Sequence, residues 1–118
     1  MKQTNVIAEK SKAFALRIIR LARYLNEEKR ETVLCRQILR SGTSVGANIR
    51  EASRGQSRAD FYTKLTIALK EADETAYWLE LLHESEYIPT QAYDSLYADC
   101  QELIRLLTAI TRTIRKDL

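Results

Sequence analysis

The sequence predicts an all-α protein, an up-down-up-down bundle of four helices that forms a single domain over residues 1–118. Helix-breaking residues are scarce, with 3 glycines and 1 proline in 118 residues. Apolar residues make up 45% of the chain and recur with the helical period rather than alternating as they do in strands. Four such segments of similar length are joined by short polar links, which favours antiparallel neighbours.

The first helix is predicted from about residue 5 to residue 26. One face at 100° per residue collects the apolar side chains Ile7, Phe14, Ile18, Leu21, Ala22 and Leu25. Leu16 and Ile19 are apolar but lie off that face, which hints at a second contact surface.

The second helix is predicted from about residue 31 to residue 53, although the stretch from Arg40 to Glu51 is rich in weak helix formers. Gly42 and Gly46 would let another helix approach closely, at a propensity cost of roughly 1 kcal/mol each relative to alanine. The inward face is predicted to carry Leu34, Ile38, Ser41, Val45, Asn48, Ile49 and Ala52. A buried Asn48 would need a hydrogen-bond partner and could fix the helix register.

The third helix is predicted from about residue 58 to residue 86. Gly55 suits the position after the preceding helix, and Ser57 suits the N-cap. Besides its core stripe the helix carries a second apolar set, which we expect at a contact with another subunit: Ile67, Trp78, Leu81 and Leu82. A fourth helix, from about residue 89 to residue 115, has a clean stripe that includes Cys100, whose thiol we expect to be buried.

Composition narrows the class of protein. The formal net charge is +3 and the isoelectric point is about 8.9, so the chain is basic without resembling a polycationic tail. Two cysteines, Cys35 and Cys100, cannot build a disulfide framework or a four-ligand zinc site by themselves. No apolar run reaches the length of a membrane span and no signal peptide is recognisable, so we expect a cytoplasmic protein without membrane contact.

Arginine-bearing helix faces form the candidate nucleic-acid surface. They comprise Arg17, Arg20 and Arg23 on the first helix, with Arg36, Arg40, Arg50 and Arg54 on or just after the second. Arginine suits bidentate phosphate contacts, and because few aromatic residues interleave, backbone contacts are favoured over base stacking. Each stripe taken alone is also typical of ordinary solvated surface.

Catalytic or metal-binding constellations have little support. Glu80 and His83 match a Glu-x-x-His element of di-iron bundles, but that chemistry needs a second such element and the chain has 1 histidine. No serine or cysteine has a predicted histidine partner on its own face, and no phosphate-binding glycine loop is present. We therefore expect no enzyme activity, no metal and no cofactor; a small metal-dependent enzyme using Glu80 and His83 is the third-ranked alternative.

Two blocks carry a family resemblance. Residues 41–51, Ser-Gly-Thr-Ser-Val-Gly-Ala-Asn-Ile-Arg-Glu, and residues 61–82, ending Trp-Leu-Glu-Leu-Leu, resemble the four-helix-bundle proteins encoded in intervening sequences of bacterial 23S rRNA genes. Thr43, Ser44, Asn48 and Glu51 match motif positions, and the family offers no catalytic residues to carry over. Arg50-Glu51-Ala52 stands where many members have Ala-Glu-Gly, so the second helix is expected to run longer.

The resemblance implies a left-handed bundle that assembles into a homopentamer. It also implies a relationship to the accessory variability proteins of diversity-generating retroelements, which bind nucleic acid and a reverse transcriptase. Together with the arginine faces, this predicts a non-enzymatic bundle that binds RNA or an RNA/DNA duplex through phosphates. The alternative is a protein-interaction scaffold that recruits a partner such as a reverse transcriptase.

Overall fold

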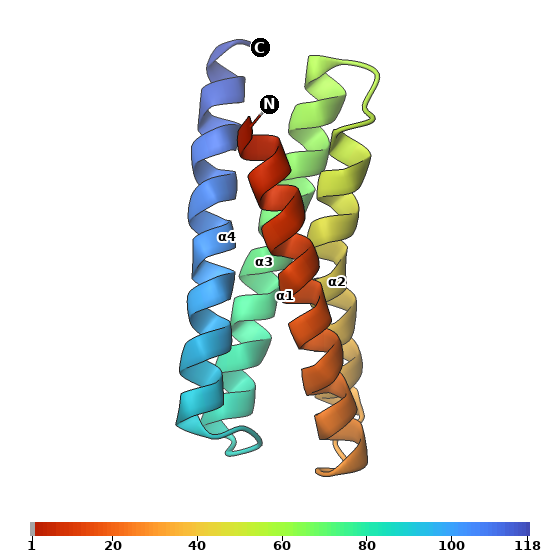
Figure 1. Cartoon of the computed structure of the whole chain (residues 1–118), viewed down its shortest axis with the longest axis vertical. Coiled ribbons are helices and arrows are strands. Elements are labelled where there is room, and N and C mark those ends of the chain that lie inside the picture. The colour runs from red at the N-terminus through yellow and green to blue at the C-terminus, as the bar shows by residue number, and fades with distance from the viewer. Residues whose placement is uncertain (1) are drawn as a thin grey trace.

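The fold is a bundle of four long helices, seen in a computed structural model that describes residues 2–118, with side chains from Thr4 onward. The helices are α1 (Lys2–Glu27), α2 (Val33–Ala52), α3 (Arg58–Glu84) and α4 (Thr90–Lys116). Consecutive helices run in alternate directions along a body of 46 × 21 × 19 Å (Figure 1). The predicted all-α four-helix bundle is confirmed, and the predicted helix bounds differ from the observed ones by at most three residues.

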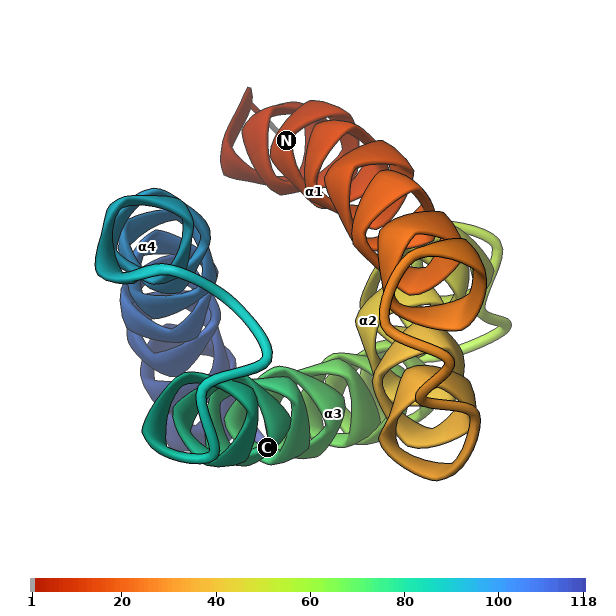
Figure 2. The ribbon, with the colours of Figure 1, turned by 90° about the horizontal axis from the view of Figure 1, so that it is seen from below.

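Each helix packs on its neighbours in the chain, and α1 closes the bundle against α4. Seen from below, α1 is inclined, so that its N-terminal half leans toward α4 while its C-terminal end lies beside α2 (Figure 2). Two ion pairs connect α1 to α4, from Lys10 to Glu102 at 3.2 Å and from Arg17 to Asp99 at 2.6 Å. None of the helices described is long and apolar enough to cross a membrane.

The core forms where the four apolar stripes meet. Its largest fully buried side chains are Phe14, Ile7, Ile18, Leu25, Ile38, Ile49, Leu65, Leu79, Leu82, Leu103, Leu107 and Val45. Burying such a side chain stabilises the fold by about 1.5–3 kcal/mol. The prediction that Leu82 lies at a subunit contact is wrong, because its side chain is 0% exposed and belongs to this core. The Cys100 thiol is buried as predicted, 3.2 Å from the Ala72 carbonyl oxygen.

The small residues of α2 bring α1 unusually close. A Cβ atom built on Gly42 would lie 2.7 Å from Cγ2 of Ile18, and one on Gly46 would lie 3.3 Å from the Ser11 hydroxyl. Those distances confirm the close helix approach that the glycines predict. Ser41 faces the other way, into the core, where its hydroxyl lies 2.8 Å from that of the buried Thr75 on α3. Ser41 and Thr75 therefore form a buried polar pair between α2 and α3.

Asn48 does not have the buried role that the sequence suggested. Its side chain is half-buried, and its amide nitrogen donates to the Ser44 carbonyl oxygen of the same helix at 2.9 Å. Asn48 lies at the border of the inward face of α2, and its side chain remains partly open to solvent. An asparagine that is satisfied within its own helix cannot set the register between helices.

The link between α2 and α3 combines one confirmed and one wrong prediction. Ser57 is the N-cap of α3, and its hydroxyl accepts a hydrogen bond from the Asp60 amide at 3.0 Å, as predicted. Gly55 was predicted at the position directly after the C-cap of α2, but the C-cap is Ser53, so Gly55 lies one residue further on, and no glycine of the described chain has a positive φ. Left-handed turns fall instead at Arg30, with φ 55°, and Glu86, with φ 66°.

Replacing Gly42 tests the close approach of α1 and α2. The alanine Cβ would meet the buried, β-branched Ile18, which cannot move aside, so we expect Gly42→Ala to lower the free energy of unfolding by about 1–3 kcal/mol despite its better helix propensity. The matched variant is Gly46→Ala, whose 3.3 Å contact needs a shift of only a few tenths of an ångström. Urea unfolding of both variants checks this; equal stabilities would contradict the packing described.

Candidate nucleic-acid interface

The seven predicted arginines do not share one surface. Arg17 lies on the α4 side of α1, where its guanidinium donates to the Asp99 carboxylate at 2.6 Å and to the Ser95 hydroxyl at 2.9 Å. Arg17 and Arg20 line a groove between α1 and α4 together with Leu21, Pro89 and Leu96. The Arg17 charge is therefore neutralised by Asp99 of the same chain, and this ion pair links α1 to α4.

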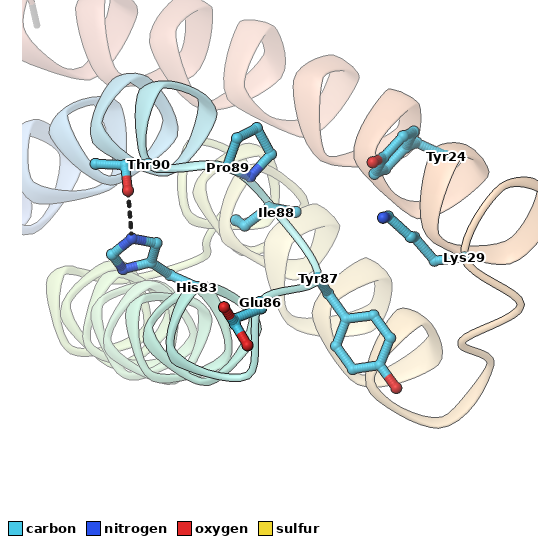
Figure 3. A pocket seen from close by; sticks show the side chains of 8 residues that line it. All are labelled: Tyr24, Lys29, His83, Glu86, Tyr87, Ile88, Pro89 and Thr90. Carbon is cyan, nitrogen blue, oxygen red and sulfur yellow. Dashed lines mark hydrogen bonds between the residues drawn. The ribbon is translucent and has the colours of Figure 1, made fainter.

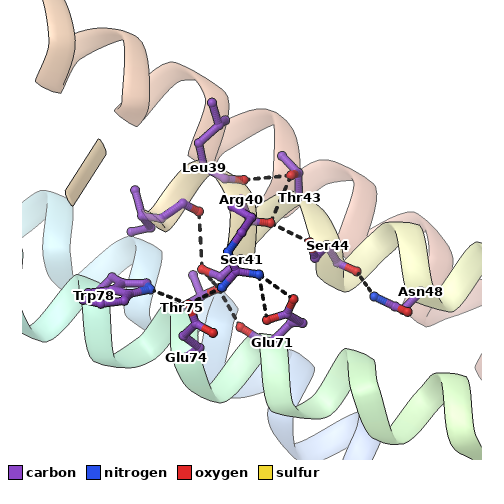
Figure 4. Close-up of polar contacts among 11 residues, drawn as sticks. Leu39, Arg40, Ser41, Thr43, Ser44, Asn48, Glu71, Glu74, Thr75 and Trp78 are labelled. Atoms are coloured by element: carbon purple, nitrogen blue, oxygen red, sulfur yellow. Dashed lines mark hydrogen bonds and ion pairs between the residues drawn. The ribbon is translucent and has the colours of Figure 1, made fainter. Parts of the chain in front are cut away.

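Arg40 is likewise engaged, as Figure 4 shows. Its guanidinium donates to both carboxylates that α3 presents, to Glu71 at 2.9 Å and to Glu74. The Trp78 indole nitrogen donates to the same Glu74 carboxylate at 2.9 Å. The Arg40 hydrogen bond, opposed by burial, lowers the pKa of Glu74, while the two carboxylates raise the pKa of Arg40. Glu71 and Glu74 are thus both paired with Arg40 of the same chain.

Four of the predicted arginines gather on the outer face of α1 and α2, together with a lysine that the sequence analysis missed. We call this surface the basic face: Lys12, Arg23, Arg36, Arg50 and Arg54. Within the described chain, none of the five forms an ion pair with a carboxylate. Their charges are available to an external anion without breaking an existing contact.

Two grooves between α1 and α2 divide the basic face. The upper groove holds about 600 Å³, and Lys12, Arg50 and Arg54 line it. The other residues that line it are mostly small, among them Ala15, Gly46 and Ala47. The lower groove holds about 410 Å³ and is lined by Arg23 and Arg36 with Ile19 and Leu39. One carboxylate, Glu51, borders the upper groove, but it pairs with Lys64 of α3 at 3.0 Å.

The charge of the basic face follows from how charge is distributed among the helices. Helix α1 carries six lysines and arginines against two acidic residues, and α2 carries three against one. Helix α3 has the opposite balance, with three basic and six acidic residues. The protein is therefore electrostatically polarised far more than a net charge of +3 suggests.

The motif residues of α2 mostly satisfy their own helix. Thr43 donates to the Leu39 carbonyl oxygen and Ser44 to the Arg40 carbonyl oxygen, each at 2.7 Å (Figure 4). Asn48 adds the bond to Ser44 described above, and Glu51 pairs with Lys64. The motif residues therefore have a structural role in α2, the helix that carries part of the basic face.

The far end of the bundle has a groove of about 510 Å³ between α1 and the α3–α4 link (Figure 3). His83 points into it, with Nε2 lying 3.0 Å from the Thr90 hydroxyl and its ring stacked on Tyr93 at 4.2 Å. Glu80 instead accepts the Tyr97 hydroxyl at 2.9 Å, which raises the pKa of Tyr97 to about 12. Glu80 and His83 thus have separate partners on α4.

Metal-binding and nucleophilic groups are sparse in what the structure describes. No group of three or more His, Cys, Asp or Glu side chains that could hold a metal ion occurs among the described residues. Burial raises the pKa of the Cys100 thiol to about 12 and also raises that of Cys35. Both thiols therefore stay protonated near neutral pH and are poor nucleophiles.

The predicted subunit-contact residues of α3 separate into three environments. Ile67 is 37% exposed, Trp78 and Leu81 are half-buried, and Leu82 belongs to the core. The sequence analysis missed Tyr77, which at 53% exposed is the most open aromatic residue of this helix. Its position, four residues before Leu81, places it on the outward side of α3.

Together these features define a small all-α bundle whose α1–α2 side is basic and whose α3 is acidic. The model of the 23S rRNA-intervening sequence protein family matches residues 3–109, so the chain belongs to that family. A crystal structure of a protein of unknown function from the S23 ribosomal protein family of Bacteroides thetaiotaomicron is similar, with 55% identity and a TM-score of 0.92. The similarity covers 93% of this chain and 98% of that one. No curated protein matches the chain.

The Arg40 contacts make a prediction about acid stability. Because the pKa of Glu74 is lowered in the fold, its contribution is complete above the ordinary value of 4.5 and is lost as the pH falls through the folded value. Arg40→Gln should remove about 1 kcal/mol or less at pH 7, since the pair is partly exposed, and should flatten the loss of stability below pH 4.5. Urea unfolding across pH 3–7 measures this.

Arg50→Gln is the matched control for that experiment, because Arg50 lies on the same helix, is exposed and has no carboxylate partner among the described residues. Its loss of stability below pH 4.5 should equal that of the unsubstituted protein. The same loss of stability in all three proteins would contradict the role given to Arg40.

Proposed function

We propose that the protein is a non-enzymatic, self-assembling bundle that binds RNA or an RNA/DNA duplex through phosphate contacts from its basic face. The observation that carries the proposal is the set of five cations on one side of α1 and α2 that have no carboxylate partner among the described residues. Arginine in such a setting binds phosphate oxygens in bidentate fashion and releases counterions from the nucleic acid.

The dimensions and chemistry of the face favour backbone contacts over base readout. Lys12, Arg50 and Arg54 line one groove of about 600 Å³, so three cations converge where neighbouring phosphates of a strand could bind. Among the residues that the structure describes, no aromatic side chain lines either α1–α2 groove. Base stacking, which needs an exposed ring, therefore has no platform there, and recognition through shape and backbone charge is the consistent mode.

Self-assembly is supported by apolar side chains that the monomer leaves open. Leu16, Ile19, Leu39, Ile67 and Tyr77 are each more than one-third exposed. The family resemblance supplies the subunit number, five, and a cytoplasmic location fits the buried, reduced thiols. The absence of an enzymatic role is supported by those protonated thiols and by the separate partners of Glu80 and His83.

A scaffold function is the second candidate, in which the protein recruits a partner such as a reverse transcriptase. The exposed Ile67 and Tyr77 of α3 favour it, since both are apolar side chains open to a partner and neither belongs to the basic face. The two functions differ in which helix faces the partner.

Reversing charge in the upper groove tests nucleic-acid binding. We expect Lys12→Glu with Arg50→Glu and Arg54→Glu to weaken binding of a 20-base-pair RNA duplex by about tenfold or more at low salt. The slope of log affinity against log salt should also fall by about 2–3, because roughly one phosphate contact is lost with each cation. Fluorescence anisotropy with an RNA duplex and an RNA/DNA hybrid measures both quantities.

The matched control changes the net charge equally on another helix, with Arg105→Glu, Arg112→Glu and Arg115→Glu on the exposed side of α4. Its slope should stay that of the unsubstituted protein. Equal losses in both variants would show a non-specific charge effect, and absence of RNA binding at low salt would favour the scaffold.

A further inference from the structure

We propose that α3 of a second copy docks into the lower α1–α2 groove, so that one copy's basic, apolar groove receives the acidic, apolar ridge of the next. This inference deepens the proposed self-assembly by naming the two surfaces and rests on it. The groove surface consists of Leu16, Ile19, Arg23, Arg36 and Leu39, and the ridge surface consists of Ile67, Asp73, Tyr77 and Glu84.

The groove surface places large apolar side chains between its two arginines. Leu16 is 46% exposed, Ile19 37% and Leu39 36%, and the last two line the hollow of about 410 Å³ between the helices. Large aliphatic side chains grouped in a hollow and bordered by arginines are typical of a protein contact. The upper groove differs, since its floor is made of small side chains.

The ridge surface offers complementary chemistry. Ile67 and Tyr77 are exposed on the outward side of α3, and the neighbouring Asp73 and Glu84 are exposed carboxylates without an ion pair in the described chain. Lys70 is the one lysine or arginine between Ile67 and Glu84. Glu71 and Glu74 are already occupied by Arg40, so they add little attraction for a neighbour.

Charge identifies α3 as the partner element. It is the single helix of the four described in which acidic residues outnumber basic ones, six against three. Helix α4 carries four basic and three acidic residues and would meet the arginines of the groove with like charge. Docking α3 instead brings Asp73 and Glu84 of one copy to Arg23 and Arg36 of another.

The two surfaces lie on different sides of one molecule, so the contact is head-to-tail. Such a contact repeats from copy to copy and either closes into a ring or continues as a filament. It also divides the basic face. Arg23 and Arg36 serve the contact between copies, while Lys12, Arg50 and Arg54 remain for phosphates.

A charge-swap cycle tests the docking. The groove variant is Arg23→Glu with Arg36→Glu, and the ridge variant is Asp73→Arg with Glu84→Arg; all four side chains are exposed, so the fold should persist. Each variant should raise the protein concentration at which half of the molecules are monomeric by about tenfold or more, since like charges then face each other. The chain carrying all four substitutions should regain association, because attraction is restored with reversed sign.

Light scattering across a concentration series gives the mass of each protein, and circular dichroism checks the fold. Arg105→Glu with Arg112→Glu on α4 is the control for net charge and should keep the parent mass. A monomeric parent protein, a mass unchanged in either swap, or a fourfold variant that stays dissociated would overturn the proposal. The upper-groove variant should keep its mass even if it loses RNA, so a failure of docking and a failure of nucleic-acid binding are distinguishable.

Discussion

The approach of α1 to α2 at Gly42 is the constraint on which the rest of the surface depends. Only a residue without a Cβ fits there, because the Ile18 side chain already occupies the space. With the helices this close, the small side chains at Ala15 and Ala47 become the floor of a shallow groove, and the arginines and Lys12 stand around it. The weak helix formers of α2 thus lower its intrinsic helix stability but allow α1 to pack closely, and this packing shapes the proposed binding surface.

Arginine does two different jobs in this bundle. Arg17 ties α1 to α4 and Arg40 ties α2 to α3, each through carboxylates of the facing helix. The arginines of the basic face have no such partner in the described chain and keep their charge toward the outside. A partly exposed ion pair contributes little stability, so these ties matter chiefly for which cations remain available to a partner.

Much of the fold was predictable because helical periodicity is a local property. The core stripes, the Ser57 cap and the buried Cys100 follow from residue type and spacing alone. Leu82 could have been placed in the core, since it follows the buried Leu79 by three residues and the buried Thr75 by seven on one face of α3. Asn48 was placed wrongly because a projection at 100° per residue gives the direction of a side chain and not what the facing helix covers. For the same reason the Ser41–Thr75 contact needed the structure, since it joins residues 34 apart in the chain.

The candidate site was less predictable than the fold. Nothing in the spacing of Arg40 tells that α3 presents Glu71 and Glu74 opposite it, because that depends on the register between two helices. Lys12 could have been found: it precedes Arg23 by eleven residues, three helical turns, and therefore lies on the same side of α1. The sequence analysis considered the spacing of arginines alone and therefore left out this lysine.

The central claim is that the α1–α2 side contacts nucleic acid while α3 contacts another copy. Hydroxyl-radical footprinting read by mass spectrometry tests this claim most directly. With an RNA duplex at low salt, the account predicts new protection around Lys12, Ala47 and Arg50 and unchanged protection of α4. Raising the protein concentration without RNA should protect Leu39 and Tyr77. RNA-dependent protection confined to α3 or α4, with the α1–α2 side unchanged, would contradict the account.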